Sequence, residues 1–170
     1  WNAKAEREGR RARVFPSVCD PFDKEANQAL RAKFFGLIDA TPCLTWLLLT
    51  KRIGNVPSML VGPGMPGQIP VNAWLGATLA NREEMLRDGP KLMTVRASVR
   101  FWSVEPMLGN LGEIPRDLLP DWVICGGESG PGARPIQADW VRGLRAQCDR
   151  AGVPFFFKQW GGRNATAGGC

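Results

Sequence analysis

Short runs of apolar residues recur along the chain, and polar or charged residues follow each run at its carboxyl end. The runs lie at residues 13–18, 45–50, 73–80, 99–104, 122–125 and 154–157. Runs of this length, bounded by glycine, proline and polar residues, are typical of buried strands. The second run, Thr-Trp-Leu-Leu-Leu-Thr, does not alternate, as expected for a strand covered on both faces. The pattern therefore predicts six strands.

Helical periodicity fills segments between these runs. Asp20 and Pro21 predict an N-cap followed by proline in the first turn of a helix. One face of this helix is marked by four apolar residues, Leu30, Phe34, Leu37 and Ile38. Residues 55–70 are rich in glycine and proline, which predicts a loop with room for one helical turn.

Two further helices are expected in the second half of the chain. Asn81 and Glu84 form a capping arrangement for a short helix, which Gly89 and Pro90 interrupt. A second helix near Asp139 is ended by Gly152. Its apolar face comprises Trp140 or Val141, Leu144, Cys148 and Ala151.

Strands that alternate with helices or long crossovers predict an α/β fold with a parallel sheet. Six units suit an open sheet or a partial (β/α) barrel. We expect one domain over residues 1–170, with a basic N-terminal segment at 1–12, a β/α core at 13–161 and a tail at 162–170. The charged opening and the Gly-Gly-Cys ending indicate a protein truncated at both ends.

Composition narrows the chemistry. The chain has no histidine and no tyrosine, so acid–base work falls to Asp, Glu, Lys or Cys. No Cys-x-x-Cys pair occurs, which argues against a metal site within the chain and favours reduced, buried thiols. We expect a cytoplasmic protein, because neither a signal peptide nor an apolar stretch long enough for a membrane is present.

The net charge is +6, and much of the excess lies near the N-terminus, in Lys4, Arg7, Arg10, Arg11 and Arg13. A basic stretch can bind phosphate. A solvated segment or linker is the more common explanation of such a stretch.

Candidate chemistry lies where the apolar runs end, because the carboxyl ends of parallel strands share one edge of the sheet. The polar residues at these ends are Ser17, Cys19 and Asp20; Thr50, Lys51 and Arg52; Thr78 and Asn81; Ser103 and Glu105; Glu128 and Ser129; Lys158 and Gln159. A half-buried charge needs a partner. We therefore expect Lys158 to lie near Glu105 or Glu128. Strands that simply emerge into water are the alternative explanation.

Glycines follow the fifth run. Gly126 and Gly127 would let the backbone approach a ligand closely. The loop 130–132, together with Arg134, could present amides and a guanidinium to a carboxylate or phosphate. A plain tight turn explains this loop about equally well.

Five motifs occur in order: Thr50-Lys51-Arg52, Trp74-Leu75-Gly76, Ser103-Val104-Glu105-Pro106, Gly126-Gly127-Glu128-Ser129-Gly130 and Phe156-Phe157-Lys158-Gln159-Trp160-Gly161. Together they resemble the three-cysteine-motif phage proteins, a phage and bacterial family of unknown function, from about residue 11 to 162. That family carries an N-terminal cysteine cluster of iron–sulfur type, and its pattern is similar to that of radical S-adenosylmethionine enzymes with partial (β/α) barrels. Its usual Ser-Met-Ser-Asp run reads Ser17-Val18-Cys19-Asp20 here, so Asp20 matches.

The resemblance implies the cofactor- and substrate-binding portion of a radical S-adenosylmethionine enzyme, inactive by itself. Its 4Fe-4S cluster would be held by a missing N-terminal segment with the cysteine motif. The implied catalytic residues are Glu105 and Lys158. The implied cofactor-binding residues are Gly126, Gly127, Glu128, Ser129 and Arg134. The implied substrate-binding residues are Asp20, Thr50, Lys51, Arg52, Ser103 and Gln159.

Two other functions stay open. The chain could be a non-catalytic α/β module that binds nucleic acid or a partner protein through its basic side. It could also be an ordinary metal-free enzyme that uses Glu and Lys. A Cys-x-x-Cys cluster upstream of Trp1 would favour the radical enzyme, whose substrate would be a nucleic acid or a protein.

Overall fold

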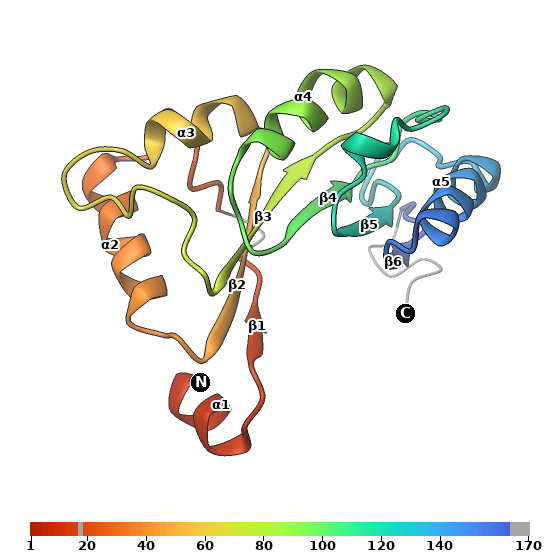
Figure 1. Cartoon of the computed structure of the whole chain (residues 1–170). Coiled ribbons are helices and arrows are strands. Elements are labelled where there is room, and N and C mark those ends of the chain that lie inside the picture. The colour runs from red at the N-terminus through yellow and green to blue at the C-terminus, as the bar shows by residue number, and fades with distance from the viewer. Residues whose placement is uncertain (17–18, 164–170) are drawn as a thin grey trace.

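The computed structural model describes residues 1–16 and 19–163. Six strands form one sheet in chain order: β1 (Ala12–Val14), β2 (Leu44–Thr50), β3 (Ala73–Thr78), β4 (Arg100–Val104), β5 (Trp122–Gly126) and β6 (Phe155–Gln159). Every neighbouring pair is parallel. The predicted α/β fold with a parallel six-stranded sheet is confirmed, and the sheet curls into a half-barrel (Figure 1).

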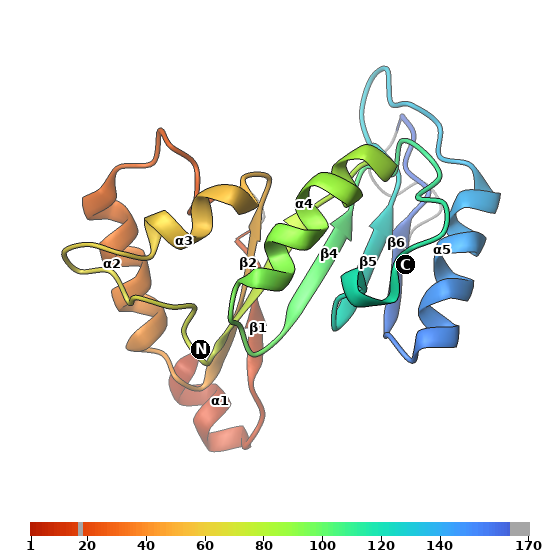
Figure 2. The same ribbon diagram turned by 45° about the horizontal axis from the view of Figure 1, so that its top comes forward.

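The helices are α1 (Asn2–Glu8), α2 (Gln28–Asp39), α3 (Val56–Met59), α4 (Arg82–Thr94) and α5 (Ala138–Ala151). Short 3-10 turns lie at Ile53–Asn55 and Arg116–Leu118. Helices α2 to α5 cover the outer face of the sheet, while α1 lies beyond the amino end of β1 (Figures 1 and 2). We call the uncovered face of the sheet the concave face.

Alternation along the strands separates two apolar layers. The larger layer packs between the sheet and the helices and includes Trp102, which is fully buried. A second cluster, on the concave face, comprises Leu47, Phe101 and Ile124, with Leu49, Trp74 and Trp122 packed around them. The sheet is therefore apolar on both faces over most of its length, as the run at 45–50 predicted.

The first helix differs from its prediction. It begins at Gln28, and the side chain of Asn27 caps it by accepting from the Ala29 N–H. The predicted N-cap at Asp20 was wrong, because the Asp20 carboxylate instead accepts hydrogen bonds at the end of β2.

The buried face of α2 also differs. It comprises Arg31, Phe35 and Ile38, whereas the predicted Leu30 and Leu37 are 64% and 50% exposed. Arg31 can be buried because its guanidinium donates to the carbonyls of Pro21, Asp23 and Ala26. A pattern of apolar residues cannot reveal a buried arginine. The predicted buried face was therefore shifted around the helix.

Helix α4 runs through Gly89 and Pro90, so the predicted interruption was wrong. Proline deprives the carbonyl of Leu86 of its partner four residues on. The predicted capping is confirmed, since Asn81 Oδ1 accepts from the Glu84 N–H and Glu84 Oε2 accepts from the Ala80 N–H.

The other elements follow the sequence closely. Helix α5 buries Val141, Leu144 and Cys148 and ends at Gly152, whose φ is 70°. The loop after β2 contains the short helix α3, as expected. Strand β1 is an exception: it stops at Val14 instead of continuing along the predicted run 13–18, since Pro16 has no N–H for the ladder. Ser17 and Val18 lie outside the described residues. Within residues 1–16 and 19–163, no helix is both long and apolar enough to span a membrane.

Candidate functional site

A hollow of about 300 Å³ lies at the carboxyl ends of β2 to β6, on the concave face. Its lining brings together eight of the predicted site residues: Lys51, Ser103, Glu105, Gly127, Glu128, Ser129, Lys158 and Gln159. Thr78, Phe15, Leu49 and Pro106 complete the lining. We call this the rim hollow.

The centre of the rim hollow is an ion pair. Lys158 Nζ lies 3.1 Å from Glu105 Oε1, and the Ser103 hydroxyl donates to Glu105 Oε2 over 3.1 Å. The Glu105 side chain is 15% exposed, whereas that of Lys158 is 50% exposed. Of the two partners expected for Lys158, the structure therefore selects Glu105. A ligand can reach the ammonium directly and the carboxylate only from within the hollow.

Two further polar groups in the rim hollow have no partner within the described part of the chain. Thr78 Oγ1 is buried without a hydrogen bond. No carboxylate there forms a salt bridge with Lys51, although its backbone N–H is held by Asp20. An unsatisfied buried hydroxyl costs about 1–3 kcal/mol. A ligand that bonds Thr78 would recover part of that cost.

The two glycines at the end of β5, Gly126 and Gly127, are required by contacts within the chain. A Cβ on Gly126 would lie 2.8 Å from Glu105 Oε1, so glycine lets the carboxylate pack against β5. A Cβ on Gly127 would overlap the carbonyl oxygen of Trp160. The close approach that was attributed to a ligand is therefore made by neighbouring parts of the protein.

Glu128 is held by the loop that follows it. Its carboxylate accepts from the backbone N–H, Nε and Nη2 of Arg134 over 2.8–2.9 Å. Ser129 beside it accepts from the Gln159 side-chain amide at 2.6 Å. Arg134 does not line the rim hollow, so its guanidinium shapes the 128–134 loop in this conformation.

The protonation of Glu128 should be measurable separately from that of the other carboxylates in the chain. The hydrogen bonds from the Arg134 side chain and backbone lower the pKa of Glu128 from 4.5 to about 2. Because the pKa is depressed, the pairing is complete above pH 4.5 and is lost as the pH falls through about 2. We expect the Arg134 amide chemical shift to titrate near pH 2, and Arg134→Gln to move the Glu128 midpoint back towards 4.5. A wild-type midpoint near 4.5 would contradict the pairing.

The remaining predicted residues lie behind the hollow. Asp20 accepts from the Thr50 hydroxyl at 3.0 Å, from the Lys51 N–H at 3.1 Å and from the Phe22 N–H at 3.0 Å. Arg52 forms a salt bridge with Asp23 at 3.1 Å. These contacts fix the loop after β2 and the backbone of Lys51.

Comparison with known protein families gives a match over residues 1–168 to a family described as "Protein of unknown function (DUF5131)". The chain belongs to this family. No curated protein and no solved structure matches it. The fold and site of the DUF5131 chain therefore have to be interpreted from its own geometry.

The cysteines of the DUF5131 chain do not form a cluster site in the described residues, where no three His, Cys, Asp or Glu side chains gather as metal ligands. Cys19 is exposed, Cys43 is half-buried, and Cys125 and Cys148 are buried. Desolvation raises the pKa of Cys125 to about 12 and that of Cys148 to about 11. Buried thiols of this kind are poor ligands. Cys170 lies outside the described residues. The four cysteines within residues 1–16 and 19–163 do not fit a 4Fe-4S cluster.

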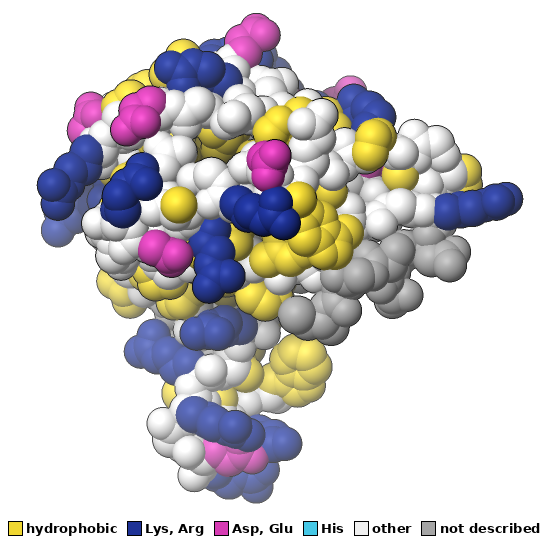
Figure 3. Space-filling model, turned by 90° about the vertical axis from the view of Figure 1, so that its right-hand side faces the viewer, with side chains coloured by type: hydrophobic (Ala, Val, Ile, Leu, Met, Phe, Trp, Pro, Cys, Tyr) yellow, Lys and Arg dark blue, Asp and Glu magenta, His cyan; other side chains and the backbone are white. Residues whose placement is uncertain are grey.

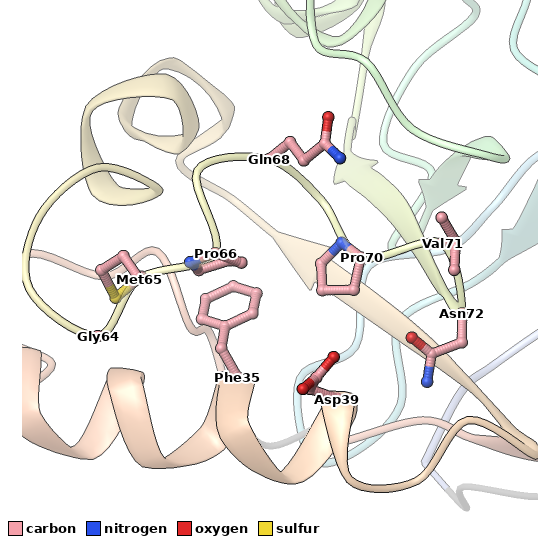
Figure 4. A pocket seen from close by; sticks show the side chains of 9 residues that line it. All are labelled: Phe35, Asp39, Gly64, Met65, Pro66, Gln68, Pro70, Val71 and Asn72. Carbon is pink, nitrogen blue, oxygen red and sulfur yellow. The ribbon is translucent and has the colours of Figure 1, made fainter.

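A second hollow, of about 430 Å³, lies between α2 and the loop before β3 (Figure 4). Phe35 points from α2 towards Pro66 and Pro70, and Asp39 lies one turn further on (Figure 4). The Asn72 side chain at its edge already donates to the carbonyls of Ile38 and Thr41. This larger hollow offers one carboxylate and few converging polar groups, so the rim hollow is the better candidate site.

Sequence reasoning placed Thr78 among the polar strand ends but missed the apolar part of the rim hollow. Leu49 belongs to β2 and Phe15 follows β1, and neither side chain carries a chemical signal of its own. Alternation along β3 places Thr78 and Trp74 on the same face of the sheet. Only the strand register shows that this is the concave face.

Proposed function

We propose that this DUF5131 chain is the cofactor- and substrate-binding portion of a radical S-adenosylmethionine-like modifying enzyme. The observation that carries the proposal is the rim hollow at the carboxyl edge of a half-barrel. The Glu105–Lys158 pair, the Thr78 hydroxyl and Lys51, which forms no salt bridge with any described residue, meet there. Parallel α/β sheets bind ligands at this edge. The sequence resemblance to radical enzymes with partial barrels suggests that the ligand is S-adenosylmethionine.

The donor set suits S-adenosylmethionine. Glu105 can accept from an α-ammonium group, and Lys51 or Lys158 can bind an α-carboxylate. The hydroxyls of Thr78 and Ser103 match ribose hydroxyls, and Leu49 and Phe15 offer apolar surface to adenine. When bound and given one electron, S-adenosylmethionine supplies the radical chemistry that starts hydrogen abstraction from a substrate.

In this proposal, residues of the chain position the Glu105 carboxylate for the ligand. Gly126 lets Glu105 lie against β5, and Ser103 fixes one carboxylate oxygen, so that the other faces Lys158. A ligand ammonium would share Glu105 with Lys158, and the displaced Lys158 would be available for the ligand carboxylate. Both Glu105 and Lys158 would thus keep a partner of opposite charge when the ligand binds.

Calorimetric titration of S-adenosylmethionine into the 170-residue chain tests this function. We expect Glu105→Gln and Lys158→Gln each to weaken binding about 10- to 100-fold, the size of a lost charge-assisted hydrogen bond. The control is Arg150→Gln, an exposed change on α5 that should leave the affinity unchanged. Equal affinities in wild type and both rim variants would reject the site. Absence of any binding would favour the binding-module alternative.

A further inference from the structure

The basic N-terminal segment lies at the amino end of β1, an edge strand of the sheet (Figure 1). Lys4, Arg10 and Arg11 line a hollow of about 490 Å³ beside Trp1. Lys and Arg side chains crowd the lower end of the molecule in Figure 3, where Figure 1 shows α1. This surface therefore lies at the amino end of β1, the strand that leads to the rim hollow.

Arg13 links the two regions. Its guanidinium carbon lies 5.4 Å from the ring centroid of Trp74, which belongs to the apolar cluster of the concave face. Two residues later, on the same side of the chain, Phe15 lines the rim hollow. Arg13, Trp74 and Phe15 thus connect the basic N-terminal segment with the rim hollow.

The charge along this path is largely uncompensated. Glu8 pairs with Lys4 at 3.6 Å and with Arg10 at 3.0 Å. Arg7, Arg11 and Arg13 are exposed and form no salt bridge within residues 1–16 and 19–163. Lys51 continues the series at the rim. Several unpaired cations along one path favour a ligand with several negative charges.

Aromatic rings accompany the charges. Phe15 is 37% exposed on the β1 side of the sheet, and Phe156 is 45% exposed on β6. Phe156 shares the concave face with Lys158, two residues on, and half-buried Trp74 and Trp122 lie between the two edges. Exposed rings beside arginines are the means by which proteins stack unpaired bases. An acidic peptide would satisfy the charges but not the rings.

We propose that the concave face binds single-stranded nucleic acid, with phosphates along Arg11 and Arg13 and bases stacked on the rings of the concave face that border the rim hollow. This assigns the substrate class of the proposed enzyme and rests on that function for its catalytic meaning. The binding itself does not depend on S-adenosylmethionine. A duplex is disfavoured because its base faces are stacked on one another.

Fluorescence anisotropy with labelled 12-nucleotide oligo(U) and oligo(dT), and with a duplex of equal length, tests the proposal. We expect both single strands to bind at least tenfold more tightly than the duplex, with strong salt dependence. Arg11→Gln combined with Arg13→Gln should weaken binding at least tenfold and reduce the log–log salt slope by about 1.4, since each phosphate contact contributes about 0.7. Arg116→Gln with Arg150→Gln makes the same charge change on exposed residues outside this path and should alter affinity less than twofold.

Three results would overturn the proposal: equal losses in the two double variants, tighter binding of the duplex, or binding of a polyglutamate peptide but not the oligonucleotides. The last result would assign the surface to a protein partner. Glu105→Gln separates the two proposals, because it should weaken S-adenosylmethionine binding and leave oligonucleotide binding within twofold. Conversely, the Arg11/Arg13 double variant should leave S-adenosylmethionine binding unchanged.

Discussion

Replacing Gly127 with alanine should destabilise the chain by about 3 kcal/mol or more, enough to prevent folding of a marginally stable domain. The added Cβ would overlap the Trp160 carbonyl oxygen, lie 2.7 Å from its carbon, and approach Ile136 Cγ2 to 3.1 Å. The first two atoms belong to the backbone, so no side-chain rotation can relieve the overlap. The hydrogen bond from the Gly127 N–H to the Gln159 carbonyl, 2.9 Å long, holds the two segments together at this point.

Gly143 supplies a matched control. It lies within α5, and a Cβ there would meet nothing within 4 Å. Gly143→Ala should therefore stabilise the chain by about 0.5–1 kcal/mol, the usual gain for alanine in a helix. Urea unfolding of both variants measures the contrast. A Gly127→Ala protein as stable as wild type would show that the segments after β5 and β6 do not approach as closely as described.

Replacing Asp20 with alanine should cost about 2–3 kcal/mol of stability. One carboxylate joins the Phe22 N–H, the Thr50 hydroxyl and the Lys51 N–H, and hydrogen bonds to a charged group contribute more than neutral ones. Thr50→Val removes one of these three bonds and also the bond that the Thr50 hydroxyl accepts from the Arg52 N–H at 2.8 Å, and should cost about 1–2 kcal/mol. The exposed Asp117 on the Arg116–Leu118 turn is the control, and Asp117→Ala should change stability by less than about 0.5 kcal/mol.

This prediction also separates two roles of Asp20. The resemblance assigns it to substrate binding, whereas its contacts fix the segment that carries Lys51. A positioning role predicts a loss of stability in chemical unfolding and only a secondary effect on ligand affinity. A variant that is fully stable but has lost binding would restore Asp20 to the ligand site.

The sequence alone predicted the parallel α/β architecture. Strand identity and helix periodicity depend on residues within about ten positions of one another, and these signals are strong in β2, α5 and the strand ends. The rim of polar residues followed from the same reasoning, because parallel strands emerge at one edge. Errors came at three places. Asp20 bonds the end of β2 instead of capping a helix, Arg31 is a buried polar residue on the inner face of α2, and α4 continues through Gly89 and Pro90.

Partner choice was decided only by the tertiary structure. The sequence allowed Lys158 to pair with Glu105 or Glu128, and the register of β4, β5 and β6 selected Glu105, while the following loop gave Glu128 to Arg134. The reason for Gly127 also lies 33 residues away, in the backbone of Trp160. Local patterns determine which elements form, but contacts of a few ångströms between distant segments depend on strand register and sheet curvature, which local periodicity does not encode.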